Sequence, residues 1–246
     1  MMQRFLSITS VAMLMAPATS FVLHMPTTIR QPSAISSTPD LSADLFDSEG
    51  WKPIEEDLNK LPIFTVANPE GKPLAYTVET KDNESYTAPF FYVDVDDALE
   101  ELQKAKDSTG LEGLDLVPYP MGQAFQLWTT AKAVIVPSKQ AILQAGAPQG
   151  TDPIGQQVPL FACMDIMQEA ADGRGVLPLF MLLEDANLAM EQALELDGGS
   201  PEEFEVISLS LGRAVEMLAT VPDTPAFQFI PPSTSVKYIQ EYLSGA

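Results

Sequence analysis

The sequence predicts an α+β fold of two pseudo-symmetric lobes from an internal duplication, each with a small sheet and packed helices. The first observation behind this prediction is a series of short apolar strands and amphipathic helices that occurs twice in the same order. The second is that 46% of the residues are apolar, which is enough for a sizeable core. Because an internal repeat of this length indicates one supersecondary unit used twice, we expect a first lobe over 61–147 and a second over 158–246.

The apolar strands are the clearest part of the repeat. The segment Leu61–Phe64 is echoed by Val158–Phe161, and Ala88–Val93 is echoed by Leu177–Leu182. Each carries a proline near its start, where a missing N–H is tolerated. Two further matches are Leu114–Pro118 with Phe204–Ser208 and Ala133–Pro137 with Phe227–Pro231. This alignment places four aromatic residues at equivalent positions of the two lobes: Phe64, Phe91, Phe161 and Phe180.

Helices follow the strands in both lobes. One expected helix carries Met121, Ala124, Phe125 and Trp128, and its counterpart carries Leu211, Ala214, Val215 and Leu218. Both quartets have the spacing of one buried helical face, and they are 90 residues apart in the sequence. Further helices are expected from Asp94, from Glu184, around Ala141–Ala145 and around Val236–Leu243. Residues 148–157 are rich in Gly, Pro and Gln, which predicts a linker between the lobes.

The N-terminal segment has the composition of a targeting sequence. The first 39 residues contain no Asp or Glu, in a chain with 34 acidic residues. An apolar stretch is followed by Ala18 and Ser20 at the positions where a signal-peptidase site requires small side chains. We therefore predict a signal peptide over 1–20, followed by a Ser- and Thr-rich transit peptide over 21–39.

An aromatic residue, Phe21, stands directly after the expected signal cleavage site. This junction resembles the bipartite presequence of algae with red-type secondary plastids, so the resemblance implies import into a complex plastid. The alternative is an ordinary secretory signal followed by a disordered linker. Residues 40–60 are expected to form an N-terminal amphipathic segment that precedes the first lobe.

Charge limits the classes of partner. Without the first 39 residues, the chain has 11 basic and 34 acidic residues. Nucleic acid is excluded as a partner, because neutralising phosphates requires clustered Lys and Arg, and none of the 11 lies in a run. An acidic surface favours basic partners, which include transit peptides. The mature chain has no apolar stretch long enough to span a bilayer, so any membrane contact is expected to be peripheral.

Few residues offer catalytic chemistry. The one histidine, His24, lies in the expected targeting segment, which excludes histidine-dependent nucleophiles and His-ligated metals from the mature protein. The one cysteine, Cys163, is interpreted as a core thiol. The acidic run Asp94–Asp97 suits a divalent cation, but it also precedes an amphipathic pattern, and we interpret it as a helix cap and first turn. Gly173–Gly175 is interpreted as a tight turn. No catalytic, cofactor-binding or metal-binding residue is predicted, and the client-binding residues stay unknown.

Three segments carry a resemblance to a known family. They are Leu61–Val66, the strand and acidic helix Pro89–Leu102, and the strand Phe229–Pro231 that leads to Val236. In these segments the chain resembles the Tic22-like proteins of chloroplast envelopes and cyanobacteria. The resemblance implies a two-lobed α+β fold with apolar surface pockets. It also implies a place in the envelope intermembrane space or at the periphery of the inner envelope. The strand Val134–Pro137 departs from the aromatic-rich family pattern, which leaves a pocket on that face in doubt.

The resemblance implies a function without catalysis. The expected role is to bind or chaperone preproteins with transit peptides during plastid protein import, together with other envelope translocon subunits. Two alternatives remain at this point: a purely structural subunit of an envelope complex, and a carboxylate-dependent enzyme acting through Asp96. No cofactor is implied by the resemblance, and the family has no established catalytic residues to transfer.

Overall fold

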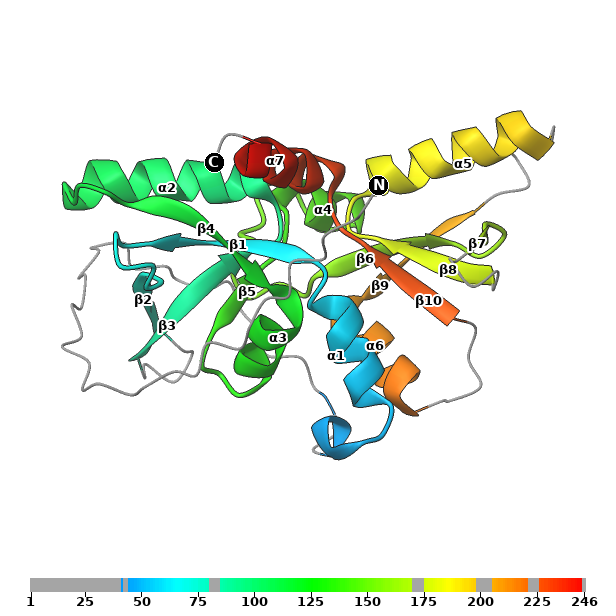
Figure 1. Ribbon diagram of the computed structural model, residues 1–246, viewed down its shortest axis with the longest axis horizontal. Helices are drawn as coiled ribbons and strands as arrows, with labels where there is room; N and C mark the ends of the chain where they lie inside the picture. Colours follow the sequence, from blue (N-terminus) through cyan, green and yellow to red (C-terminus); the bar gives the residue numbers. More distant parts are fainter. Residues whose placement is uncertain are drawn as a thin grey trace, which may run out of the picture.

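A computed structural model describes residues 41, 44–79, 85–169, 175–197, 205–220 and 226–244 (Figure 1). The expected signal peptide, 1–20, and transit peptide, 21–39, lie outside these residues, as do Gly173 and Arg174 of the expected turn. The described part begins within the segment 40–60, for which the sequence predicts amphipathic character. There Trp51, Ile54 and Leu58 form the buried face of a helix.

The elements occur in two similar series. The 3₁₀ turn η1 (Leu45–Asp47) and helix α1 (Trp51–Leu58) come first. The first series is β1 (Pro62–Ala67), β2 (Ala75–Glu79), β3 (Ser85–Tyr92), α2 (Val95–Thr109), β4 (Asp115–Pro120), α3 (Met121–Thr129), β5 (Val134–Val136) and α4 (Lys139–Gln144). The second series is β6 (Pro159–Cys163), β7 (Gln168–Glu169), β8 (Gly175–Phe180), α5 (Leu183–Asp197), β9 (Val206–Ser210), α6 (Leu211–Thr220), β10 (Ala226–Ile230) and α7 (Ser233–Ser244).

The two sheets have the same connectivity. In the first sheet β1 lies between β3 and β4, antiparallel to both, while β2 pairs antiparallel and β5 pairs parallel with β3. In the second sheet β6 lies between β8 and β9 in the same way, and β7 and β10 pair with β8 in the same senses. The mixed α+β fold expected from the sequence is therefore confirmed, and β2 and β7 are additions that the sequence analysis missed.

The register corrects one part of the sequence alignment. Phe64 pairs with Tyr92, and Phe161 pairs with Phe180, so Phe180 is the counterpart of Tyr92. Phe91 was expected to match Phe180, but it points to the opposite face of its sheet, into a different core cluster. The alignment had matched the prolines of the two strands, and a shift of one residue reverses the face of every side chain in a strand.

Helices cover both faces of the sheets. In Figure 1, α2, α7, α4 and α5 run along the upper side, and α1, α3 and α6 lie on the lower side. The lower layer closes one core shared by the two sheets. Phe91 and Ile135 of the first sheet, Leu160 and Phe229 of the second, and Trp128 of α3 all belong to this core. The expected lobes 61–147 and 158–246 therefore bury much of their apolar surface against a common layer of helices.

The last helix of each series packs on the other series. Ala141 of α4 belongs to the outer core of the second sheet, with Phe161 and Phe180. In the opposite direction, α7 lies beside α2 on the outer face of the first sheet (Figure 1). Its Tyr238 makes an edge-to-face contact with Phe64, with ring centroids 5.6 Å apart. This reciprocal exchange joins the two series at both outer cores as well as at the shared one.

One hydrogen bond that anchors these exchanged helices occurs in both series. Asp97, the third residue of α2, accepts a hydrogen bond at 2.9 Å from the backbone N–H of Lys139, the first residue of α4. Asp185, the third residue of α5, accepts one at 3.0 Å from the backbone N–H of Ser233, the first residue of α7. Each carboxylate thus satisfies an N–H group that the helix itself leaves without a partner.

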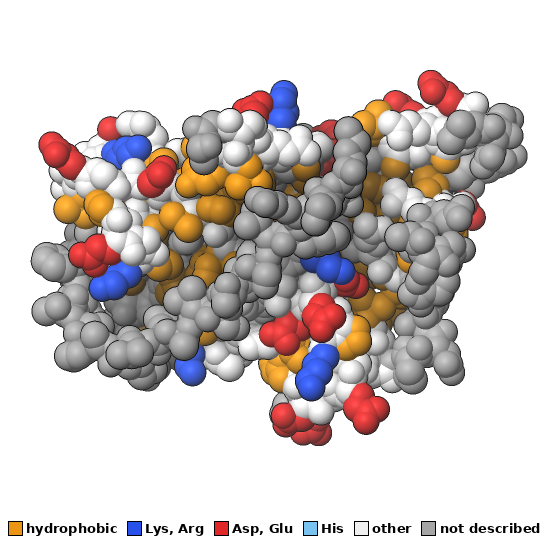
Figure 2. Space-filling view, in the orientation of Figure 1, with side chains coloured by type: hydrophobic (Ala, Val, Ile, Leu, Met, Phe, Trp, Pro, Cys, Tyr) orange, Lys and Arg blue, Asp and Glu red, His pale blue; other side chains and the backbone are white. Residues whose placement is uncertain are grey.

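Acidic side chains gather around η1 and α1 at the bottom of the space-filling view (Figure 2). The acidic residues of η1 and α1 are Asp47, Glu55, Glu56 and Asp57. In the part of the chain that the structure describes, no helix is both long enough and apolar enough to cross a membrane.

Candidate functional site

A surface groove of about 400 Å³ lies beside helix α3. Its walls come from η1, from the end of β4, from α3 and from the turn that follows α3. The lining residues are Phe46, Tyr119, Gln123, Gln126, Leu127, Thr130 and Lys132. The groove therefore lies on the side of α3 that faces away from the shared core, in the lower layer of helices in Figure 1.

The amphipathic pattern of α3 supplies one wall of the groove. Its Met121, Phe125 and Trp128 are buried in the shared core, as their helical spacing predicts. On the opposite face of the helix, Gln123 and Leu127 line the groove. The same periodicity that fixes the helix on the core thus presents amide and apolar groups to the surface.

Helix α1 fixes the position of α3. Pro120, the N-cap residue of α3, has no side-chain group that can cap the helix, and the Asn59 side chain instead accepts a hydrogen bond from the Gln123 N–H at 3.1 Å. Gln126 donates to the Glu55 carboxylate at 2.8 Å. At Gly122 an added Cβ would lie 2.7 Å from the Asn59 side-chain oxygen, so glycine permits this close approach.

Aromatic rings connect the groove with the core. Phe46 packs edge-to-face on Trp51 with centroids 4.9 Å apart, and Trp51 stacks on Phe125 at 5.9 Å. On the opposite wall Tyr119 lies 4.8 Å from Phe91. Burial raises the pKa of the Tyr119 phenol above its usual 10.0. Its hydroxyl is therefore neutral near pH 7 and available as a hydrogen-bond donor.

The chemistry of the groove suits binding. Phe46, Tyr119 and Leu127 offer apolar surface, while Gln123 and Thr130 offer neutral hydrogen-bonding groups. The charged lining residue is Lys132, and the lining set contains no cysteine, histidine or carboxylate. Concave sites that combine apolar surface with hydrogen-bonding groups typically bind ligands or peptide segments. The sequence analysis named none of these residues as a site, although the outward face of α3 was present in its periodicity.

The counterpart of this groove in the second series has a different surface. At the positions of Gln123 and Gln126, α6 carries Arg213 and Glu216, which form an ion pair at 3.0 Å. At the position of Leu127 it carries Met217, which is 39% exposed. The groove described above therefore combines residues of the first series with Phe46 of η1, which precedes both series.

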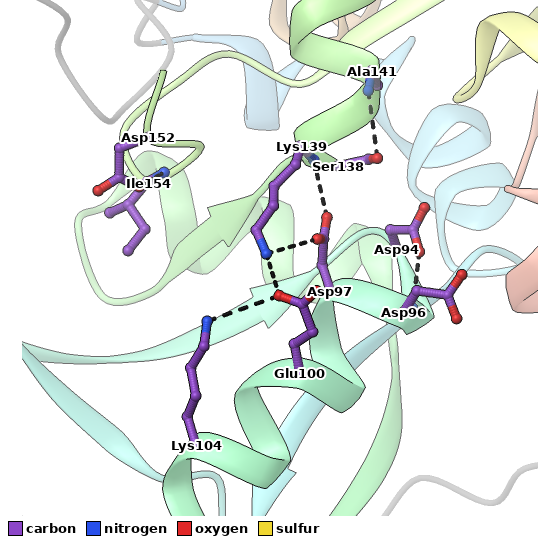
Figure 3. A network of polar contacts seen from close by, with 10 residues as sticks. All are labelled: Asp94, Asp96, Asp97, Glu100, Lys104, Ser138, Lys139, Ala141, Asp152 and Ile154. Carbon is purple, nitrogen blue, oxygen red and sulfur yellow. Dashed lines mark hydrogen bonds and ion pairs between the residues drawn. The ribbon is translucent and has the colours of Figure 1, made fainter. Parts of the chain in front are cut away.

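The acidic run Asp94–Asp97 is structural, as the capping interpretation predicted (Figure 3). Asp94 is the N-cap residue of α2, and its side chain accepts a hydrogen bond from the Asp96 N–H at 2.9 Å. Burial is the main cause that raises the pKa of the Asp94 carboxyl above its usual 3.8. The run therefore forms the N-cap and part of the first turn of α2.

Asp97 belongs to a second set of contacts, which join α2 to α4 (Figure 3). Besides the Lys139 N–H, it lies 3.3 Å from the Lys139 ammonium group, which also pairs with Glu100. The Ser138 hydroxyl caps α4 by accepting from the Ala141 N–H at 3.4 Å. Among the described residues, no group of three or more His, Cys, Asp or Glu side chains could hold a metal ion. Cys163 is buried in β6.

Comparisons with known proteins identify the fold. No protein-family model matches the sequence, and no curated protein matches it. Two solved structures are similar. Tic22 from Plasmodium falciparum has a TM-score of 0.63 and 21% identity, over 79% of this chain and 100% of that one. Tic22 from Anabaena, described as a protein of protein transport, has a TM-score of 0.58 and 18% identity, over 78% of this chain and 96% of that one. The chain therefore has the fold of these two structures, which confirms the resemblance at the level of the fold.

Proposed function

We propose that this chain is a non-catalytic component of plastid protein import that binds segments of preproteins in the α3 groove. The observation that carries the proposal is the likeness of almost the whole described chain to two Tic22 structures, one of them described as a protein of protein transport. The groove supplies a binding site on that fold, with apolar walls and polar groups suited to a peptide.

The groove favours a short segment with an apolar anchor. An apolar side chain of the preprotein packs between Phe46 and Leu127, while Gln123 and Thr130 bond to its backbone. Gln126 is already engaged by Glu55 and serves to hold the wall in place. Basic residues that flank the anchor face the acidic side chains around η1 and α1 (Figure 2).

The proposed location is a plastid envelope, in the intermembrane space or at the periphery of the inner membrane, with other translocon subunits as partners. Its support is the acid-free N-terminal segment with Phe21 after the expected cleavage site. An acidic chain also suits an encounter with basic transit peptides by long-range attraction.

We further infer that the two series arose by internal duplication. Three details support this inference. The sheets share strand order and pairing senses, the carboxylates of Asp97 and Asp185 make the same contact, and the exchange of α4 and α7 is reciprocal. Packing two such units together buries a larger share of their surface than either buries alone.

A peptide-binding experiment tests the proposed function. The probe is a fluorescently labelled transit peptide, and its affinity for the chain without residues 1–40 is measured by anisotropy. Leu127→Glu places a charge on the apolar wall, which should weaken binding by about tenfold or more. Met217→Glu makes the same change at the counterpart position of α6 and should leave binding unchanged. Equal affinities for the wild type and the Leu127 variant would remove the groove from the proposal.

The alternative of a purely structural subunit makes a different prediction. A subunit of that kind suppresses no aggregation of an unfolded client and binds no transit peptide, yet co-purifies in fixed proportion with envelope proteins. Aggregation suppression by the wild type, reduced in the Leu127→Glu variant, therefore separates the two functions.

A further inference from the structure

The edge strands β4 and β9 occupy equivalent places in the two sheets. Phe64 of β1 faces Pro118 of β4, and Phe161 of β6 faces Ser208 of β9. Two residues further along each strand, Pro120 of β4 corresponds to Ser210 of β9 in the same register. Among the described residues, no strand pairs with the outer edge of either β4 or β9.

Hydrogen bonds at the ends of these strands show which backbone groups face outward. Leu211 N–H donates to the Val158 carbonyl at 2.8 Å, which marks the pair 158 and 211 as hydrogen-bonded. Hydrogen-bonded pairs alternate along an antiparallel ladder. The N–H groups of Val206, Ser208 and Ser210 therefore point away from β6, toward the open edge.

The outer edge of β4 is closed to further pairing. The same reasoning, from the bond between the Met121 N–H and the Leu61 carbonyl at 3.1 Å, makes residues 116, 118 and 120 the outward positions of β4. Pro118 and Pro120 have no N–H group. The Leu116 N–H donates to the Asp115 side chain at 2.8 Å. Each outward donor position of β4 is thus either without a hydrogen or already bonded, which protects the edge.

Among the residues that the structure describes, the outer edge of β9 has none of this protection. The strand reads Val-Ile-Ser-Leu-Ser, without proline or charge. Ile207 is 40% exposed, and Ser208 is exposed as well. Proteins usually cover such an edge or interrupt it with charges or proline, because free N–H and C=O groups in a row are a template for another strand.

We propose that β9 binds an extended segment of a preprotein as an added strand of the second sheet. The segment is basic, because Asp165 and Glu205 are exposed at the end of the edge where β9 begins. A second copy of this chain is disfavoured as the occupant, since it would bring the same acids and a net charge of −21 to the contact. This inference deepens the proposed function and rests on it for the nature of the partner.

Strand addition provides binding that does not depend on the sequence of the client, which the α3 groove alone does not provide. Backbone bonds to Val206, Ser208 and Ser210 are independent of the sequence of the client, and an apolar client side chain can cover Ile207. The edge and the α3 groove lie on different series of the fold, so one long unfolded segment can occupy both. Two linked contacts raise the overall affinity above that of either site.

The experiment copies the protection of β4 into β9. Ser208→Pro removes an outward N–H at the position where Pro118 is accommodated in β4, and Ser208→Ala is the matched control that keeps the N–H. The probe is a labelled nonapeptide of alternating Val and Arg, and a second peptide carries N-methyl groups on alternate amides. We expect Ser208→Pro to weaken binding by about tenfold, through lost hydrogen bonds and the bulk of the ring, and Ser208→Ala to have no effect.

Amide exchange gives a test that needs no variant. In the wild type the Val206 and Ser208 amides should exchange rapidly, become protected when the Val-Arg peptide is added, and stay unprotected with the N-methylated peptide. Protection of both amides before peptide is added would overturn the proposal, as would equal binding of the two peptides. Protection that depends on protein concentration alone would assign the edge to a second copy and overturn it too. Loss of transit-peptide binding in Leu127→Glu, with full binding in Ser208→Pro, would leave the groove standing and remove the edge.

Discussion

The contact between Tyr238 of α7 and Phe64 of β1 allows a quantitative test of the helix exchange. Tyr238 is half-buried against the outer core of the first sheet, although it belongs to the second series. A tyrosine ring presents roughly 150–250 Å², so burying about half of it contributes about 2 kcal/mol. The edge-to-face pair with Phe64, at 5.6 Å, adds about 1 kcal/mol. Tyr238→Ala should therefore lower the free energy of unfolding by about 3 kcal/mol.

Two spectroscopic signals can follow this loss. Trp51 and Trp128 both lie in the shared core, so their fluorescence reports the joining of the two series. Far-ultraviolet circular dichroism reports the helices and sheets together. In a chain of this size a loss of 3 kcal/mol lowers the melting temperature by about 6–12 °C. Both signals should shift by the same amount, because the series share their cores and unfold as one unit.

The control lies one turn further along the same helix. Tyr242 stacks on Tyr238 at 6.4 Å but is 48% exposed. Tyr242→Ala should cost about 1 kcal/mol or less, since little of its area is removed from water. Two separate transitions in the wild type, or a Tyr238 variant whose fluorescence transition does not move, would refute the reasoning.

Three further predictions concern other sites in the fold. Asp97→Ala and Asp185→Ala should each cost about 1 kcal/mol in urea unfolding, as lost helix caps do, and the double variant should show a nearly additive loss. Gly50→Ala and Gly122→Ala should each cost about 1–3 kcal/mol in the same assay, because the added Cβ would lie 2.5 Å from the Ala219 carbonyl oxygen in the first case and 2.7 Å from the Asn59 side chain in the second. Burial raises the pKa of the Glu101 carboxyl above its usual 4.5, so the folded chain holds this proton more tightly than the unfolded chain does. The free energy of unfolding should therefore fall as pH rises from 4.5 through the folded-state pKa, and Glu101→Gln should flatten that fall in thermal melts at pH 5 and pH 8.

Sequence periodicity predicted the elements that pack against a core. The quartet Met121, Ala124, Phe125 and Trp128 is buried as its spacing indicates. Asp94 is the N-cap residue of α2, as the acidic run indicates. These features depend on residues close together in the chain, so composition and spacing determine them. The strand alignment was less accurate, because proline positions were taken as equivalent although the pairing with β1 and β6 sets the register.

The sequence could not predict the features that depend on distant contacts. The α3 groove needs Phe46 of η1 beside Leu127 of α3, two residues far apart in the chain. The exchange of α4 and α7 was missed for the same reason, since a short helix carries no signal of which sheet it will cover. A signal for the caps did exist: an acid at the third position of both α2 and α5. The backbone N–H groups that these acids bind, on Lys139 and Ser233, can be identified only from the fold.

The two series share internal contacts but differ at their surfaces and edges. Internal contacts such as the carboxylates of Asp97 and Asp185 are retained, because losing either leaves helix N–H groups without partners. The edges differ, with Pro118 in β4 and Ser208 in β9 at the same register. In the proposed function, one closed edge and one open edge would let a single fold present a groove on one series and a strand template on the other. Under this proposal, a contact of each kind would hold an unfolded segment at two separated points, and linking the two contacts raises the overall affinity above that of either one.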